Sequence, residues 1–167
     1  MLKAIGKKLI DFISVIFVFR FTSRTSVCAL FAVAYKKGPA SSRPELRSLY
    51  PSLCQDETPM VRRAAANKLG QFIAEIEPEH AQGEFLALFK TLAHDDQDSV
   101  RLLICTAICP LAGKLSHEDQ ETELLPELKC FSEDKSWRVR QSYANHIVQV
   151  LQVLETQTYV PYPIFRH

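Results

Sequence analysis

Two cysteines and a histidine are the side chains whose spacing comes nearest to a metal site. Cys105 and Cys109 lie four residues apart, which places both thiols on one helical face, and His117 follows. A zinc site needs a fourth ligand and a tighter cluster. The other cysteines are scattered among apolar neighbours, which also argues against a disulfide framework: Cys28, Cys54 and Cys130. The sequence therefore predicts packed free thiols, with no metal and no cofactor.

Catalytic chemistry has no recognisable motif in this sequence. It contains no Gly-rich phosphate loop, no Gly-x-Ser-x-Gly elbow and no His-Glu-x-x-His pair. The histidines are dispersed, with no nucleophile at a telling spacing: His80, His94, His117, His146 and His167. We therefore expect no enzyme activity. An all-α enzyme is the rival hypothesis, and a phosphatase assay without an added catalytic subunit would test it.

A recurring Asp and Arg offer electrostatic chemistry instead. The pattern Asp, four free positions, then Val-Arg occurs three times at intervals of 39 residues. The Asp can cap a helix at its positive end, and the Arg can pair with the Asp of the next copy. Because these residues recur in register with the helix ends, we interpret them as a structural ladder: Asp56, Arg62, Asp95, Arg101, Asp134 and Arg140.

The elements that position this pattern are helices. Apolar residues keep the same period, and within one copy they recur from Val61 at i, i+4, i+8, i+11 and i+15, which is a helical stripe. Each unit is a hairpin with a short helix A, a turn at the Asp and a longer helix B. Such a period favours an all-α HEAT-repeat solenoid, whose stacked units bury the stripes. The expected pairs are 43–54 with 58–76, 79–93 with 97–115, and 119–132 with 136–154, with a right-handed twist.

Residues at the helix boundaries agree with these pairs. Ser42 can cap the first A helix, Pro78 can open the second, and Ser116 with Asp119 resembles a capping box. Pro110 falls inside the middle B helix, where it lacks a hydrogen-bond donor and crowds the preceding turn. We therefore expect a kink near residues 106–109.

The chain divides into three segments. Residues 22–155 form the solenoid, with a partial repeat at 22–40 and repeats at about 43–76, 79–115 and 119–154. Residues 1–21 are an apolar amino-terminal segment, and residues 156–167 are a tail that contains two prolines. A basic start before an apolar run resembles a secretory signal. However, Asp11 interrupts a run that is too short to cross a bilayer, so a helix covering the end of the stack is preferred over a membrane segment.

Charge separates the amino-terminal segment from the repeats. Residues 1–40 carry seven Lys and Arg against one Asp, whereas residues 41–155 carry twelve against eighteen Asp and Glu. Mildly acidic repeats argue against nucleic acid as a partner. The free thiols, together with the case against a secretory signal, favour a location in the cytoplasm, extending to the nucleus.

Whole octapeptides at the turns resemble the scaffolding A subunit of protein phosphatase type 2A. The matching runs are Thr58 to Ala66, Gln97 to Leu103 and Glu133 to Arg140, within a resemblance that covers residues 21–151. It implies a horseshoe of HEAT repeats without catalytic activity. Regulatory B-type subunits would contact the turns, and the catalytic subunit would bind carboxy-terminal repeats that have no counterpart here. The sequence reads as a truncated or divergent family member.

Candidate partner-binding residues lie on the three turns, which form one ridge. Trp, Met and Arg are enriched at interface hot spots. The candidates are Asp56, Pro59, Met60, Arg63, Asp96, Asp98, Trp137 and Arg138. For Trp137, partner binding and packing between repeats remain equally open. A generic transport-type HEAT adaptor and a truncated form without function are the alternatives to the phosphatase scaffold.

Overall fold

The computed structural model describes residues 11, 13 and 20–157, and within them every regular element is helical. The first helical segment and the three hairpins agree with the predicted all-α repeat fold and its predicted pairs. The segment preceding the first hairpin comprises α2 (Phe21–Val27), η1 (Cys28–Leu30) and α3 (Phe31–Lys37). A short turn, η2 (Ala40–Ser42), then leads into the first hairpin.

The hairpins share one plan, although only the first has two unbroken helices. The first is α4 (Arg43–Cys54) and α5 (Pro59–Glu75). In the second, α6 (Pro78–His80), η3 (Ala81–Phe85) and α7 (Leu86–Ala93) form helix A, and α8 (Asp98–Ile104), η4 (Cys105–Ala107) and α9 (Ile108–Ala112) form helix B. In the third, helix A consists of α10 (His117–Asp119), η5 (Gln120–Leu124) and α11 (Leu125–Ser132), and helix B is α12 (Trp137–Gln157).

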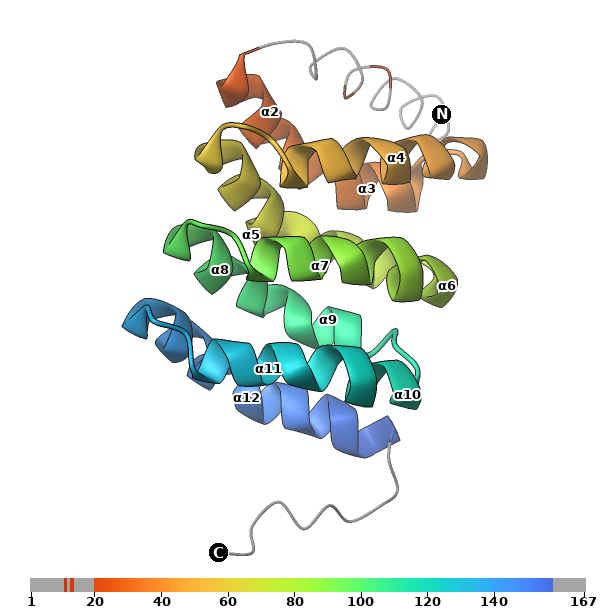
Figure 1. Ribbon diagram of the computed structural model, residues 1–167. Coiled ribbons are helices and arrows are strands. Elements are labelled where there is room, and N and C mark those ends of the chain that lie inside the picture. Colours follow the sequence, from red (N-terminus) through yellow and green to blue (C-terminus); the bar gives the residue numbers. More distant parts are fainter. Residues whose placement is uncertain (1–10, 12, 14–19, 158–167) are drawn as a thin grey trace, which may run out of the picture.

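The hairpins stack in one direction and form two layers. Figure 1 shows α4, α7 and α11 one below another in one layer, with α5, α8 with α9, and α12 behind them. The turns between the A and B helices all lie at the same edge of the stack, on the left in Figure 1. This edge, which we call the turn edge, brings together the recurring Asp and Arg residues.

The predicted apolar stripes form a continuous core between the layers. Val61, Val100 and Val139, at equivalent places in the three B helices, are fully buried. An aromatic group fills the joint between the first helical segment and the first hairpin: Phe31 packs edge-on against Tyr50 at 4.9 Å between ring centroids, and Tyr50 lies 4.8 Å from Phe72. Each hairpin therefore buries its stripe against its neighbour, as the period predicted.

Proline and serine shape the helix ends as the sequence only partly predicted. Ser116 accepts a hydrogen bond from the backbone N–H of Asp119 at 3.1 Å, which confirms that cap. The Asp119 carboxylate, however, lies 2.6 Å from the Ser116 hydroxyl, so it does not complete a capping box with the backbone. Ser42 makes no side-chain cap, because the chain enters α4 through a 3-10 turn, so that prediction is wrong.

The middle B helix is interrupted close to the expected place. The 3-10 turn η4 separates α8 from α9 just before Pro110, whose missing donor would leave the carbonyl of Thr106 without an α-helical bond. Gly70 of α5 lies against this turn: a Cβ added there would stand 3.0 Å from both Ala107 Cα and Thr106 O. A side chain at position 70 would therefore crowd the interrupted helix where it approaches its neighbour.

Most of the two terminal segments lies outside the described residues. The covering helix, the secretory interpretation and the tail at 156–167 thus remain predictions, although Ile13 is buried in the core. Within the part of the chain that the structure describes, no helix is long and apolar enough to span a membrane.

Candidate functional site: the turn edge and its ladder

An arginine from each of the first two B helices binds the aspartate of the next hairpin at the turn edge. Arg62 donates from Nε and Nη2 to the two carboxylate oxygens of Asp95, at 2.6 and 3.1 Å. Arg101 binds Asp134 in the same two-pronged way, at 2.8 and 3.0 Å. These planar, charge-assisted pairs are the strong form of an ion pair. The structure thus brings the ladder residues together as the spacing suggested.

Sequence reasoning missed the first rung of this ladder. Arg24 of α2 donates to both carboxylate oxygens of Asp56, at 2.7 and 3.2 Å. Arg24 lies 38 residues before Arg62, one residue out of the 39-residue register, and so escaped the pattern. The ladder therefore runs through every joint from the first helical segment to the third hairpin.

The ladder arginines of the three hairpins also hold the turns of their own hairpins. Nη1 of Arg62 donates to the backbone carbonyl of Asp56 at 3.0 Å, and Nη1 of Arg101 donates to that of Asp95 at 2.7 Å. Arg140 makes the same bond to Asp134 at 2.6 Å. One guanidinium therefore fixes both its own turn and, in the inner joints, the next one.

The aspartates close the turns instead of capping the helices. Asp56 accepts a hydrogen bond from the backbone N–H of Thr58 at 2.9 Å, and Asp134 accepts one from Ser136 at 2.8 Å. Thr58 is the residue that directly precedes α5, so Asp56 lies two residues before the N-cap position of that helix. The predicted N-cap is thus an Asx turn, which presents the carboxylate to the preceding arginine.

The arginines hold the ladder carboxylates in their charged form. The hydrogen bond from Arg101 lowers the pKa of Asp134 below its usual value, even though partial burial opposes this. For Asp56, burial raises the pKa, but the bonds from Arg24 and from Thr58 outweigh it, and the pKa is lowered. Arg101 itself is only 6% exposed, so this rung is the most shielded part of the ladder.

Large apolar side chains project outward from the same edge. Met60 at the start of α5 is 52% exposed, and Trp137 at the start of α12 is 64% exposed. Pro59 and Arg63 are exposed beside Met60. The described neighbours leave most of Trp137 uncovered, and its two interpretations, partner binding and packing between repeats, both stay predictions.

The remaining ridge candidates are partly committed to contacts within the chain. Asp96 accepts a hydrogen bond from Nη2 of Arg62 at 2.7 Å, so it extends the ladder. Asp98 accepts one from the Ser136 hydroxyl at 2.8 Å and lies 3.9 Å from Nη1 of Arg138. Asp98 and Arg138 thus connect two turns across the ridge, while more than half of the Arg138 side chain stays exposed.

The cysteines form no metal centre in the described residues, which contain no group of three or more potential ligands. All five cysteines are free. Burial raises the pKa of Cys28 to about 12 and that of Cys105 to about 11, which keeps both thiols protonated and unreactive at neutral pH.

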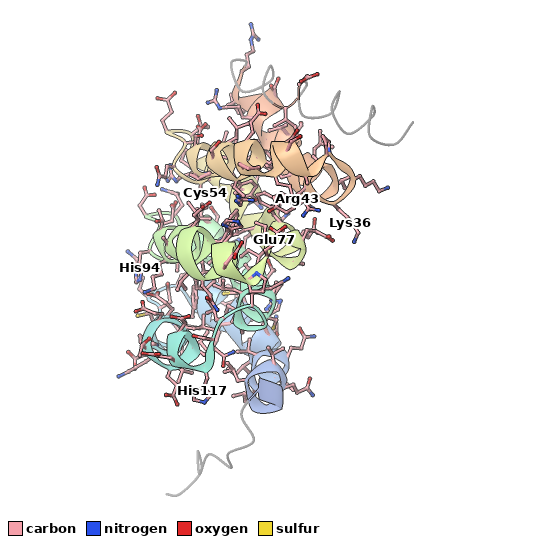
Figure 2. All side chains as sticks on the ribbon, turned by 90° about the vertical axis from the view of Figure 1, so that its right-hand side faces the viewer. Lys36, Arg43, Cys54, Glu77, His94 and His117 are labelled. Atoms are coloured by element: carbon pink, nitrogen blue, oxygen red, sulfur yellow. The ribbon has the colours of Figure 1, made fainter. Side chains whose placement is uncertain are left out.

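Sequence reasoning also missed a pair of side chains in a hollow beside the ladder. Nε2 of His94, at the end of α7, lies 2.9 Å from Oε2 of Glu127 on α11. Figure 2 shows His94 projecting at the side of the stack. A signal was present, because Glu127 stands in register with Leu49 and Leu88 and breaks an otherwise apolar column.

Stacked helical hairpins, joined at one edge by a repeated Arg–Asp contact, define this chain as a HEAT-repeat solenoid. The sequence model of the family described as sister chromatid cohesion protein PDS5 matches residues 19–157, and the chain therefore belongs to that family of helical-repeat proteins.

Curated relatives refine this assignment and confirm the resemblance drawn from the turns. The PP2A regulatory A subunit of Schizosaccharomyces pombe is 38% identical over 136 residues, which cover 80% of this chain and 23% of the relative. A probable PP2A regulatory subunit of Caenorhabditis elegans is 52% identical over 84 residues, covering 50% of this chain and 14% of the relative. The A-beta isoform of the human 65 kDa PP2A regulatory subunit is 54% identical over 57 residues, covering 34% and 10%. The chain thus spans less than a quarter of the length of these relatives.

Proposed function

We propose that this chain is a non-catalytic scaffold that holds a regulatory B-type subunit of protein phosphatase 2A on its turn edge. The observation that carries the proposal is the exposure of Met60 and Trp137 on an edge whose backbone is fixed by the ladder. Exposed Trp and Met suit a protein interface, and a backbone that is already fixed loses little conformational entropy on binding. The relatives, which are named as PP2A regulatory subunits, support the same role.

The surface on offer is small, so we expect a weak complex. Three turns present only part of the area that stable protein interfaces bury, and the exposed anchors are few. In this proposal the described repeats hold the regulatory subunit and not the catalytic subunit. The proposed location is the cytoplasm, extending to the nucleus, where the free thiols would stay reduced.

A pull-down with purified regulatory and catalytic subunits, offered separately, tests this function. We expect capture of the regulatory but not of the catalytic subunit. Trp137→Ala, and charge reversal at Arg63 or Arg138, should abolish the capture. His80→Ala is the matched control, because His80 lies in α6, at the edge of the stack opposite the turns, and should leave capture unchanged.

The opposite results are equally informative. Capture of only the catalytic subunit would contradict the proposal, and so would capture of the regulatory subunit by the Trp137→Ala variant at wild-type strength. Capture of neither purified subunit, but of transport factors from a cell extract, would favour the generic HEAT adaptor.

A further inference from the structure

A hollow of about 490 Å³ opens beside the ladder between the second and third hairpins. The rung formed by Arg101 and Asp134 contributes one wall, and His94, Glu127 and Lys135 are among the other residues that line the hollow. Five carboxylates border the hollow against two permanently cationic side chains. The hollow is therefore acidic, although the ladder arginines neutralise its aspartates.

Glu127 is the carboxylate that the fold leaves without a full partner. It is only 9% exposed, and its Oε2 is buried without an aligned hydrogen-bond donor. His94 Nε2 lies 2.9 Å away, but the contact has no hydrogen-bond geometry, and the imidazole is charged only when protonated. A buried carboxylate in this state carries a free-energy cost that a bound cation would remove.

The repeat register shows that this carboxylate is not required by the fold. The equivalent positions in the first and second A helices are Leu49 and Leu88, and Leu88 is buried. One helical turn earlier, Glu123 forms an ion pair with Lys90 across the same two A helices, so the carboxylate of Glu123 has a cationic partner. Glu127, which has no such cationic partner among the described residues, lies directly beside the turn edge, where a bound partner would reach it.

We propose that the hollow receives an arginine side chain of the protein that occupies the turn edge, with its guanidinium bound to Glu127. Arginine suits the site better than lysine because its planar, weakly hydrated head forms two-pronged bonds with buried carboxylates. The ladder itself contains this chemistry in the grip of Arg101 on Asp134. This inference rests on the proposed function for the identity of the partner, but the acceptor site is defined by this chain alone.

Binding of a purified regulatory subunit to the full chain tests the inference through Glu127. Glu127→Gln removes the charge, and Glu127→Leu restores the residue type of the other two hairpins. Both should weaken binding by about tenfold or more, the loss expected when one member of a buried charge pair is removed. Glu118→Gln, an exposed glutamate on α10, is the matched control and should bind like the wild type. Thermal unfolding of Glu127→Leu at or above the wild-type temperature would show that the fold is intact.

A peptide experiment separates failure of this site from failure of the proposed function. Acetyl-Gly-Arg-Gly-amide at millimolar concentration should shift the imidazole NMR signal of His94, whereas the isosteric citrulline peptide should not. The shift should disappear in Glu127→Gln. If the wild type binds no regulatory subunit, the proposed function fails and the peptide result alone decides the site. No response to the arginine peptide, or unchanged subunit binding by both Glu127 variants, would overturn the inference.

Discussion

The two edges of the stack are held together by different means. At the turn edge every joint uses the same contact, from Arg24 with Asp56 to Arg101 with Asp134. At the opposite edge each joint is different. Figure 2 shows Lys36, Arg43 and Glu77 on that edge, where Glu77 binds Arg43 at 2.7 Å and accepts a hydrogen bond from the Tyr35 hydroxyl.

The next joint at that opposite edge contains no comparable ion pair among the described residues. Its contact runs from an amide side chain to the backbone: Gln120 donates to the carbonyl of Ala112 at 2.8 Å. Within the second hairpin, Gln82 likewise donates to the carbonyl of Lys114 at 3.4 Å. The turn edge thus repeats one Arg–Asp contact, whereas the opposite edge uses a different contact at each joint. Stability should depend strongly on any inner rung at the first edge and only weakly on single contacts at the second.

Loss of an inner rung is the largest effect that this comparison predicts. Arg101→Leu should lower the free energy of unfolding by about 3–5 kcal/mol, because it leaves the Asp134 carboxylate and two turn carbonyls without their shielded partner. Urea denaturation measures the change. Glu77→Gln, at the partly exposed pair of the opposite edge, should cost less than about 1 kcal/mol. Equal losses in the two variants would erase the distinction between the edges.

A second test addresses the packing that lies between the edges. Gly70→Ala should lower the free energy of unfolding by about 1–3 kcal/mol, since the added Cβ would meet the backbone of η4 at 3.0 Å. Gly83→Ala is the matched control, because no atom lies within 4 Å of a Cβ added at Gly83. If Gly70→Ala were as stable as the control, η4 would move to accept the added methyl group without loss of stability. The packing of the core would then stabilise this joint less than the contacts at the edges do.

Acid should weaken the turn edge with a smaller and gradual effect. The pKa of Asp56 and that of Asp134 are lowered in the folded chain, so their contribution is fully present above the ordinary Asp pKa of about 3.9. It is lost as the pH falls through the lowered folded values. Unfolding measured from neutral pH down to about pH 2 should therefore show a loss that is reduced in Asp134→Asn. An identical acid profile for that variant would show that the rung does not depend on the carboxylate charge.

The same comparison explains what could be predicted from the sequence. The hairpins and their stripes were predictable because Val61, Val100 and Val139 recur at one interval. The ladder was predictable for the same reason, whereas Arg24, one residue out of register, was not. Contacts that occur once, such as Tyr35 with Glu77, depend on three-dimensional neighbours that leave no periodic trace.

Two finer features of the site depended on local geometry. The Asx turn at Asp56 and the cap that we had expected there need the same residue type, so only the backbone distinguishes them. Glu127 was detectable in principle as a charged residue in an apolar column. The burial of Glu127 and the poor alignment of His94 with its carboxylate are visible only in the structure.

The guanidinium that binds its own turn and the next one has a mechanical consequence. Through these hydrogen bonds Arg62 and Arg101 fix the spacing of neighbouring hairpins along the turn edge. Bending the stack must then occur as rotation about that edge, with the greatest travel at the opposite edge. A partner bound at the turn edge would therefore contact side chains whose separation stays constant while the solenoid changes its curvature.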